Sequence, residues 1–63
     1  MFDLVFTNGN KVQEIERVEG TREQAIEVLK REMEGIEDRI HITMFDLDGR
    51  WVAVVSEGIL MIR

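Results

Sequence analysis

Short dipeptides that favour tight turns constrain this chain more than any other sequence feature. Asn8-Gly9 and Asp48-Gly49 each stand between runs rich in apolar residues. Asn-Gly and Asp-Gly readily take the positive φ angles that a two-residue β-hairpin turn requires. Glu57-Gly58 is a third candidate turn near the end of the sequence. We therefore expect antiparallel strands that pair around these dipeptides.

The first turn predicts a hairpin of residues 2–7 and 11–18. Apolar residues alternate on the first strand: Phe2, Leu4 and Phe6. On the return strand they recur at every third position: Val12, Ile15 and Val18. A bulge near Gln13-Glu14 would bring these three to one face of a strand, whereas a helix would also suit the spacing. We predict the bulged strand because the Asn-Gly signal is strong, and the helix remains the alternative.

One helix is predicted after Gly20. Thr21 suits the N-cap, Gln24 completes a capping box, and Gly35 is the expected C-cap. One helix face carries apolar residues at three- and four-residue spacing: Ala25, Ile26, Leu29, Met33 and Ile36. The outer face is charged, with more acidic than basic residues. Residues 39–47, 51–56 and 59–62 read as three further strands. We therefore predict a single α+β domain over residues 1–63, with one helix packed on a mostly antiparallel sheet in the order ββαβββ.

A two-residue turn at Asp48-Gly49 fixes the register of its hairpin, and Glu57-Gly58 does the same for the last strand. The face expected to hold the helix is wholly apolar: Ile40, Ile42, Met44, Ala53, Val55, Leu60 and Ile62. The second face is predicted to carry six more apolar residues: Phe45, Leu47, Val52, Val54, Ile59 and Met61. His41, Thr43 and Ser56 share that second face. An antiparallel sheet with one solvated face normally alternates apolar and polar residues, and this one does not.

The second apolar face indicates a partner. One helix, about 10 Å across, can neither span a five-stranded sheet roughly 24 Å wide nor touch its other side. Monomers rarely expose an apolar patch of this size. The sheet could curl so that the N-terminal hairpin covers the patch, a second copy could pack there, or a different protein could. We expect a homodimer through Phe45, Leu47, Val52, Val54, Ile59 and Met61.

Composition narrows the classes of function. The 63 residues include no cysteine, so neither a disulfide nor a thiolate zinc site can stabilise a chain too short to bury a large core. Oligomerisation would supply that stability. The net charge of −5 and the scattered basic residues argue against nucleic-acid binding. No apolar run is long enough for a membrane span, and no signal peptide is recognisable, so a cytoplasmic location is expected.

No residue set points to catalysis, a metal or a cofactor. Met44–Gly49 resembles the first motif of haloacid-dehalogenase-type phosphatases, in which Asp46 would be the nucleophile and Asp48 the acid/base. Arg50 stands where that motif has Thr or Ser, and a strand ending in an Asp-Gly turn explains the same residues. His41, the single histidine, has no neighbouring ligand cluster. We expect no enzyme activity, cofactor or metal.

The sequence therefore predicts a small acidic binding module that associates with itself through one apolar sheet face. The alternative is a small inhibitor or regulator of a larger protein, of the kind that mobile elements encode. Its acidic helix face would then meet a basic partner, although Lys30 and Arg31 interrupt that face.

Overall fold

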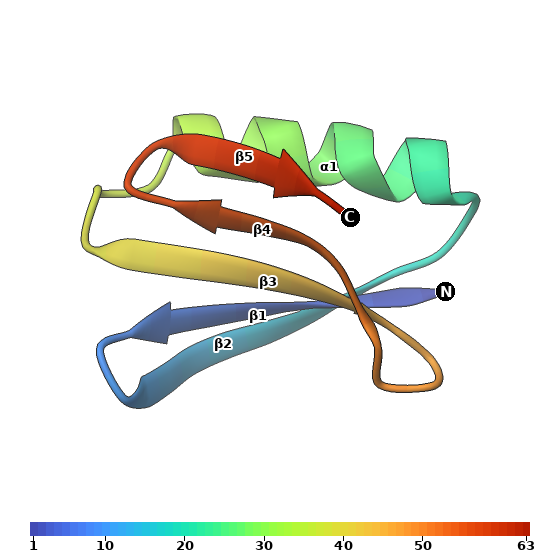
Figure 1. The fold of residues 1–63 in the computed structure, drawn as a ribbon, viewed down its shortest axis with the longest axis horizontal. Helices are drawn as coiled ribbons and strands as arrows, with labels where there is room; N and C mark the ends of the chain where they lie inside the picture. Colours follow the sequence, from blue (N-terminus) through green and yellow to red (C-terminus); the bar gives the residue numbers. More distant parts are fainter.

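The computed structural model describes all 63 residues as one helix and five strands (Figure 1). The elements are β1 (Phe2–Asn8), β2 (Lys11–Val18), α1 (Arg22–Glu34), β3 (Ile40–Asp46), β4 (Trp51–Ser56) and β5 (Ile59–Ile62). The predicted α+β class and the order ββαβββ are confirmed. Residues 11–18 form a strand, so the helical alternative for that segment is wrong.

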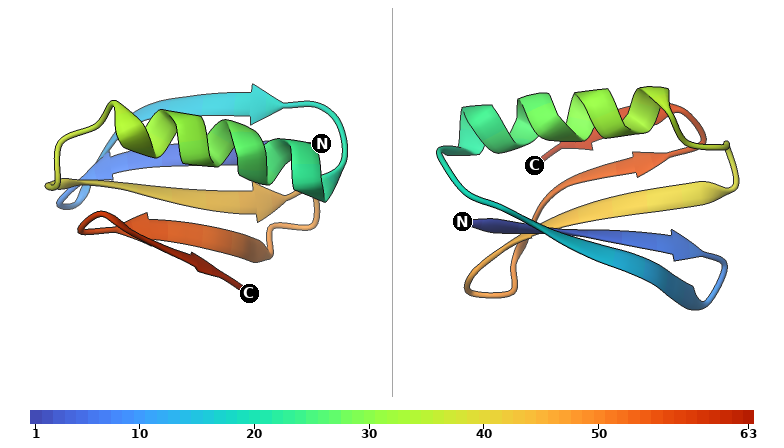
Figure 2. Two further views of the ribbon diagram at one scale, coloured as in Figure 1. Left: turned by 90° about the horizontal axis from the view of Figure 1, so that it is seen from above. Right: turned by 180° about the vertical axis from the view of Figure 1, so that it is seen from behind.

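The five strands form one antiparallel sheet in the order β2-β1-β3-β4-β5. Strand β1 pairs with β3, so the N-terminal hairpin extends the sheet sideways. Viewed from above, α1 lies across the middle of the sheet (Figure 2, left), where it contacts β1 and β3. No segment of the chain lies over the opposite side of the sheet (Figures 1 and 2). The sheet therefore does not curl to cover its own second face.

The helix begins and ends where the capping residues predict. The backbone N–H of Gln24 donates to the Thr21 hydroxyl at 3.2 Å, and the Gln24 side-chain oxygen accepts from the Thr21 backbone N–H at 2.8 Å. This reciprocal pair is the predicted capping box, and Gly35 is the C-cap. Ala25 and Leu29 are fully buried against the sheet. At 13 residues, with a charged outer face, the helix is too short and too polar to cross a bilayer.

The hydrophobic core lies between the helix and the middle strands. Its buried members are Leu4, Phe6, Val18, Ala25, Leu29, Ile40, Ile42, Met44, Val52, Ala53 and Val55. Leu60 is half-buried against this core, whereas Ile62 is 49% exposed. Both were expected beneath the helix, but α1 runs over β1 and β3 and does not cover the far edge of the sheet. The helix-side face is therefore covered in the middle and open at β5.

The β1–β2 hairpin contains the predicted bulge, with a different consequence. Phe6 pairs with Glu14 and Thr7 pairs with Val12, which leaves Gln13 as the extra residue. Val12 and Ile15 consequently share the face away from the helix, whereas Val18 pairs with Phe2 on the helix side and is buried. The expectation that one bulge unites all three apolar residues is therefore wrong for Val18. The turn is formed by Gly9 and Asn10, because Asn8 pairs with Lys11.

The β3–β4 turn differs from the predicted two-residue turn. The Asp46 backbone N–H donates to the Arg50 carbonyl at 2.9 Å, which leaves a three-residue loop of Leu47, Asp48 and Gly49. The Asp46 carboxylate accepts from the backbone N–H groups of Asp48 and Arg50, at 2.9 and 3.0 Å. Gly49 has a φ of +81°, the conformation that closes a three-residue hairpin loop.

A β-bulge at Val52 compensates for the longer loop. Phe45 pairs with Trp51, yet Met44 pairs with Ala53 as predicted, so Val52 is the extra residue in β4. Val52 and Ala53 are both buried in the core. The prediction that Val52 lies on the second face is therefore wrong. Beyond the bulge the predicted register holds, and the two-residue turn at Glu57-Gly58 pairs Val54 with Met61 as expected.

Candidate protein interface

The side of the sheet opposite the helix, called the open face below, is formed by alternate residues of all five strands. Pairing and alternation assign to it Asp3, Val5, Thr7, Val12, Ile15, Arg17, His41, Thr43, Phe45, Trp51, Val54, Ser56, Ile59 and Met61. No other element packs there, so these side chains form a continuous surface of the molecule.

An uninterrupted row of uncharged side chains crosses the centre of the open face. Successive strand pairs align Ile15 with Val5, Val5 with Thr43, Thr43 with Val54, and Val54 with Met61. Side chains in directly opposed positions on neighbouring strands contact one another. The row therefore forms one apolar ridge across the full width of the sheet, broken only by the hydroxyl group of Thr43.

The apolar residues of the open face are unusually exposed. Eight large apolar side chains of the chain remain exposed, and five of them lie on this face: Val12, Ile15, Trp51, Ile59 and Met61. Val5, Phe45 and Val54, nearer the middle, are half-buried by their neighbours. Single exposed apolar residues are common, whereas a contiguous patch is typical of an interaction site.

The open face carries one ion pair and no unpaired carboxylate, lysine or arginine. The Arg17 guanidinium donates to both carboxylate oxygens of Asp3, at 2.8 and 3.2 Å. This hydrogen-bonded pair lowers the pKa of Asp3 and raises the pKa of Arg17, so both stay charged and neutralise each other. A chain with a net charge of −5 thus presents an almost neutral face.

Negative charge gathers on the helix side of β2, the edge strand that carries Arg17 on the open face. Glu16 pairs with Leu4 and therefore faces the helix, where it meets Glu32. Partial burial raises the pKa of Glu16, and the nearby Glu32 carboxylate raises it further. The two faces of β2 therefore differ sharply, with carboxylates toward the helix and apolar side chains on the open face.

The structure separates the six predicted interface residues into two groups. Phe45, Val54, Ile59 and Met61 lie together on the open face. Leu47 belongs to the β3–β4 loop, where it is 64% exposed, and Val52 is in the core. The longer loop and its compensating bulge account for both differences.

Four apolar residues of the open face were not predicted: Val5, Val12, Ile15 and Trp51. The pairing of β1 with β3 brings the first three beside the C-terminal hairpin. A sequence signal did exist for two of them, because the Gln13 bulge places Val12 and Ile15 on the same face. Trp51 joins the face because the altered loop pairs it with Phe45.

Asp46 and His41 are the residues that could suggest catalysis, and neither lies in a cluster of reactive side chains. The Asp46 carboxylate holds the β3–β4 loop by accepting from two backbone N–H groups of the following residues, a common structural role of Asp in turns. His41 is an exposed residue of β3 on the open face, opposite Thr7. No cluster of three or more His, Cys, Asp or Glu side chains is positioned to hold a metal ion. Comparisons with protein-family models, with curated proteins and with solved structures found no match.

Proposed function

We propose that this protein is a small non-enzymatic binding module that forms a symmetric dimer by packing its open face against that of a second copy. The observation that carries the proposal is the row from Ile15 to Met61, which crosses all five strands without a charge. Two such sheets would stack about 10 Å apart, with the helices outside. Burial of the row removes from water the apolar surface that the single chain leaves exposed.

Charge favours a second copy as the occupant. A two-fold symmetric contact brings every residue of a face against the same face, so an unpaired charge there would be repelled by its counterpart. Asp3 and Arg17 already neutralise each other, and the other side chains of the open face carry no formal charge with His41 neutral. The acidic excess of the chain lies elsewhere, so two copies can meet without like-charge repulsion at the contact.

The size of the face is sufficient for a specific contact. The molecule measures 27 × 20 × 18 Å, and the sheet seen face-on in Figure 2 (left) spans its longest and shortest dimensions, which bound a face of about 500 Å². Two copies would together bury ~1,000 Å², which is about the minimum for a biological interface and smaller than the standard size of stable ones. We therefore expect a dimer of moderate affinity.

The sheet edges favour face-to-face packing over edge-to-edge pairing. Strand β5 has four residues, and β2 carries a bulge at Gln13. Short edge strands, bulges and charged side chains all discourage the addition of another strand. Strand β2 also carries Lys11, Glu14 and Glu16. The edges are thus protected, whereas the open face is not.

Sedimentation of three variants tests the proposal. Val54→Glu and Met61→Glu each place a charge in the row and should convert the dimer to a folded monomer. Ile62→Glu is the matched control, because Ile62 adjoins Met61 on β5, is 49% exposed against 54%, and points to the helix side. Its sedimentation should equal that of the wild type, with circular dichroism confirming that all variants fold.

The same experiment contradicts the proposal under two outcomes. A wild-type protein that sediments as a monomer at high micromolar concentration would rule out self-association through any face. Equal dissociation by Met61→Glu and Ile62→Glu would show that added charge acts without regard to the face. If the wild type sediments as a stably folded monomer, the remaining candidate to cover the open face is a different protein.

A further inference from the structure

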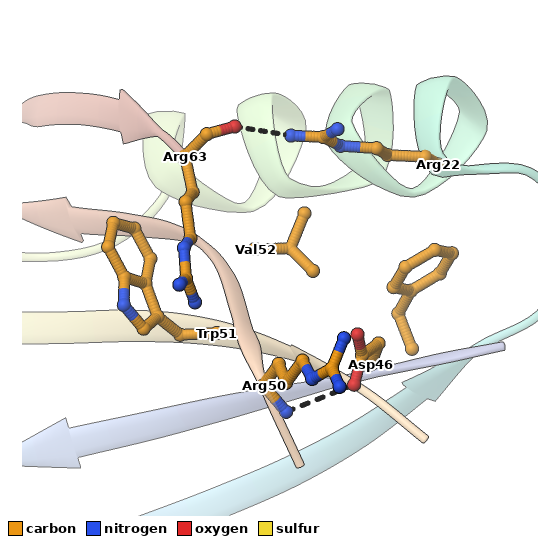
Figure 3. Close-up of a pocket in the computed structure, with 7 residues that line it drawn as sticks. Arg22, Asp46, Arg50, Trp51, Val52 and Arg63 are labelled. Carbon is orange, nitrogen blue, oxygen red and sulfur yellow. Dashed lines mark hydrogen bonds between the residues drawn. The ribbon is translucent and has the colours of Figure 1, made fainter. Parts of the chain in front are cut away.

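A pocket at one end of the molecule gathers positive charge that the acidic composition conceals. It is a depression of about 340 Å³ where the start of α1, the β3–β4 loop and the end of β5 meet (Figure 3). Arg22, Arg50 and Arg63 line it, from three segments far apart in the sequence. They are three of only eight basic residues in the chain. The fold therefore brings together three basic residues that are far apart in the sequence.

No Asp or Glu side chain forms an ion pair with these three arginines. The ion pairs of the chain are Arg17–Asp3, Lys30–Glu27 and Arg39–Glu37, all outside the pocket. The only acidic residue in the lining is Asp46, whose carboxylate accepts two backbone N–H groups of the loop.

Local contacts hold two of the arginines in place. The Arg22 guanidinium donates to the Arg63 backbone carbonyl at 2.6 Å, the upper dashed line of Figure 3. The Arg63 guanidinium lies over the Trp51 ring, 5.5 Å from its centroid. The Arg50 side chain has no hydrogen-bond partner, although its backbone N–H is bound to Asp46. The Arg50 guanidinium therefore remains available to a ligand.

The apolar part of the lining suits a flat ring. Trp51 is 39% exposed, and Phe2 and Val52 complete the apolar surface. Aromatic side chains stack on planar ligands, and guanidinium groups bind phosphate through paired hydrogen bonds. The volume lies at the small end of the range for small-molecule sites.

We propose that this pocket binds a small phosphate monoester that carries an aromatic ring, of the mononucleotide type. A phosphate monoester has a charge of about −2 near neutral pH, opposite in sign to the guanidinium groups of the lining. Arg50 and Arg63 bind the phosphate, and Trp51 contacts the ring. A long polyanion would be opposed by the net charge of −5 that the whole chain carries, whereas a single small dianion fits within the pocket.

Fluorescence of Trp51 tests the proposal directly, because it is the only tryptophan and the chain has no tyrosine. Because Trp51 lies both in the pocket and at the end of the open face, AMP, adenosine and inorganic phosphate are titrated into the wild-type chain and into Met61→Glu, in which the open face is expected to stay uncovered, with calorimetry in parallel. AMP should cause a saturable change, and adenosine and phosphate should each bind about tenfold more weakly because each lacks half of the contacts. Arg50→Gln should weaken AMP binding about tenfold or more. Arg31→Gln removes the same charge from the far end of α1 and should have no effect.

Three outcomes would overturn the proposal. The first is the absence of saturable AMP binding by both fluorescence and calorimetry. The second is an equal loss of affinity in Arg50→Gln and Arg31→Gln, which would indicate non-specific charge attraction. The third is inorganic phosphate binding as tightly as AMP, which would exclude the ring contact with Trp51. Arg50 lies outside the open face, so sedimentation of Arg50→Gln should equal that of the wild type whatever the binding result.

Discussion

Val52 and Val54 stand two residues apart on β4, yet the bulge places them on opposite faces of the sheet. Val52 is 9% exposed and belongs to the core, whereas Val54 is half-buried on the open face. Replacement of either valine by alanine removes the same two methyl groups. The two substitutions therefore differ only in the face of the sheet from which the methyl groups are removed. The difference between their losses of unfolding free energy tests whether the bulge is present.

The expected magnitudes follow from burial. Two methyl groups removed from the core cost about 0.8 kcal/mol each in lost transfer free energy. A residual cavity adds to this, so Val52→Ala should lower the unfolding free energy by about 2 kcal/mol. For a domain of this size, the melting temperature should then fall by ~10 °C. Val54→Ala should cost less than about 1 kcal/mol in the monomer, because its methyl groups remain partly in water.

Urea denaturation followed by circular dichroism provides the comparison. Both alanine variants are made in the Met61→Glu background, where dimerisation is expected to be absent and cannot add to the measured stability. Equal losses at the two positions, or a larger loss at Val54, would refute the bulge. Such a result would mean that β4 runs as a regular strand with Val52 on the open face.

Three further predictions concern the rest of the fold. Thr21→Ala removes the capping box shared with Gln24 and should lower the unfolding free energy by about 1 kcal/mol in urea, whereas Thr21→Ser should not. Glu16→Gln should stabilise the protein at neutral pH, because burial and Glu32 raise the folded-state pKa of Glu16 and so penalise its charged form. That gain should vanish below pH 4.5, the ordinary value, and a gain independent of pH would contradict the assignment. Gly49→Ala forces a side chain to a φ of +81° without a steric contact and should cost about 1–2 kcal/mol, so an unchanged urea midpoint would refute the loop geometry.

Local sequence signals predicted most of the secondary structure. The capping box at Thr21 fixed the start of the helix, and the Glu57-Gly58 turn gave the correct register for β5. The Asp48-Gly49 turn was predicted one residue too short, because the Asp46 carboxylate stabilises a longer loop through two backbone N–H groups. A dipeptide does not encode that contact, so the bulge at Val52 could not be inferred from it.

Features that depend on distant pairing were harder to foresee. Val5 and Ile15 join the open face only because β1 lies beside β3, and strand order is not visible in adjacent residues. The pocket likewise requires Arg22, Arg50 and Arg63 to meet at one end of the sheet. Part of the candidate interface was therefore predictable from alternation within one hairpin, and its full width was not.

Contact between two copies through the open face can be observed without any mutation. A sample that mixes isotope-labelled and unlabelled wild-type chains allows nuclear Overhauser effects between copies to be separated from those within a copy. The methyl groups of Val54 and Met61 should show cross-peaks to protons of the other copy, and helix residues such as Leu29 should show none. An absence of such cross-peaks at a concentration where the protein sediments as a dimer would contradict association through the open face.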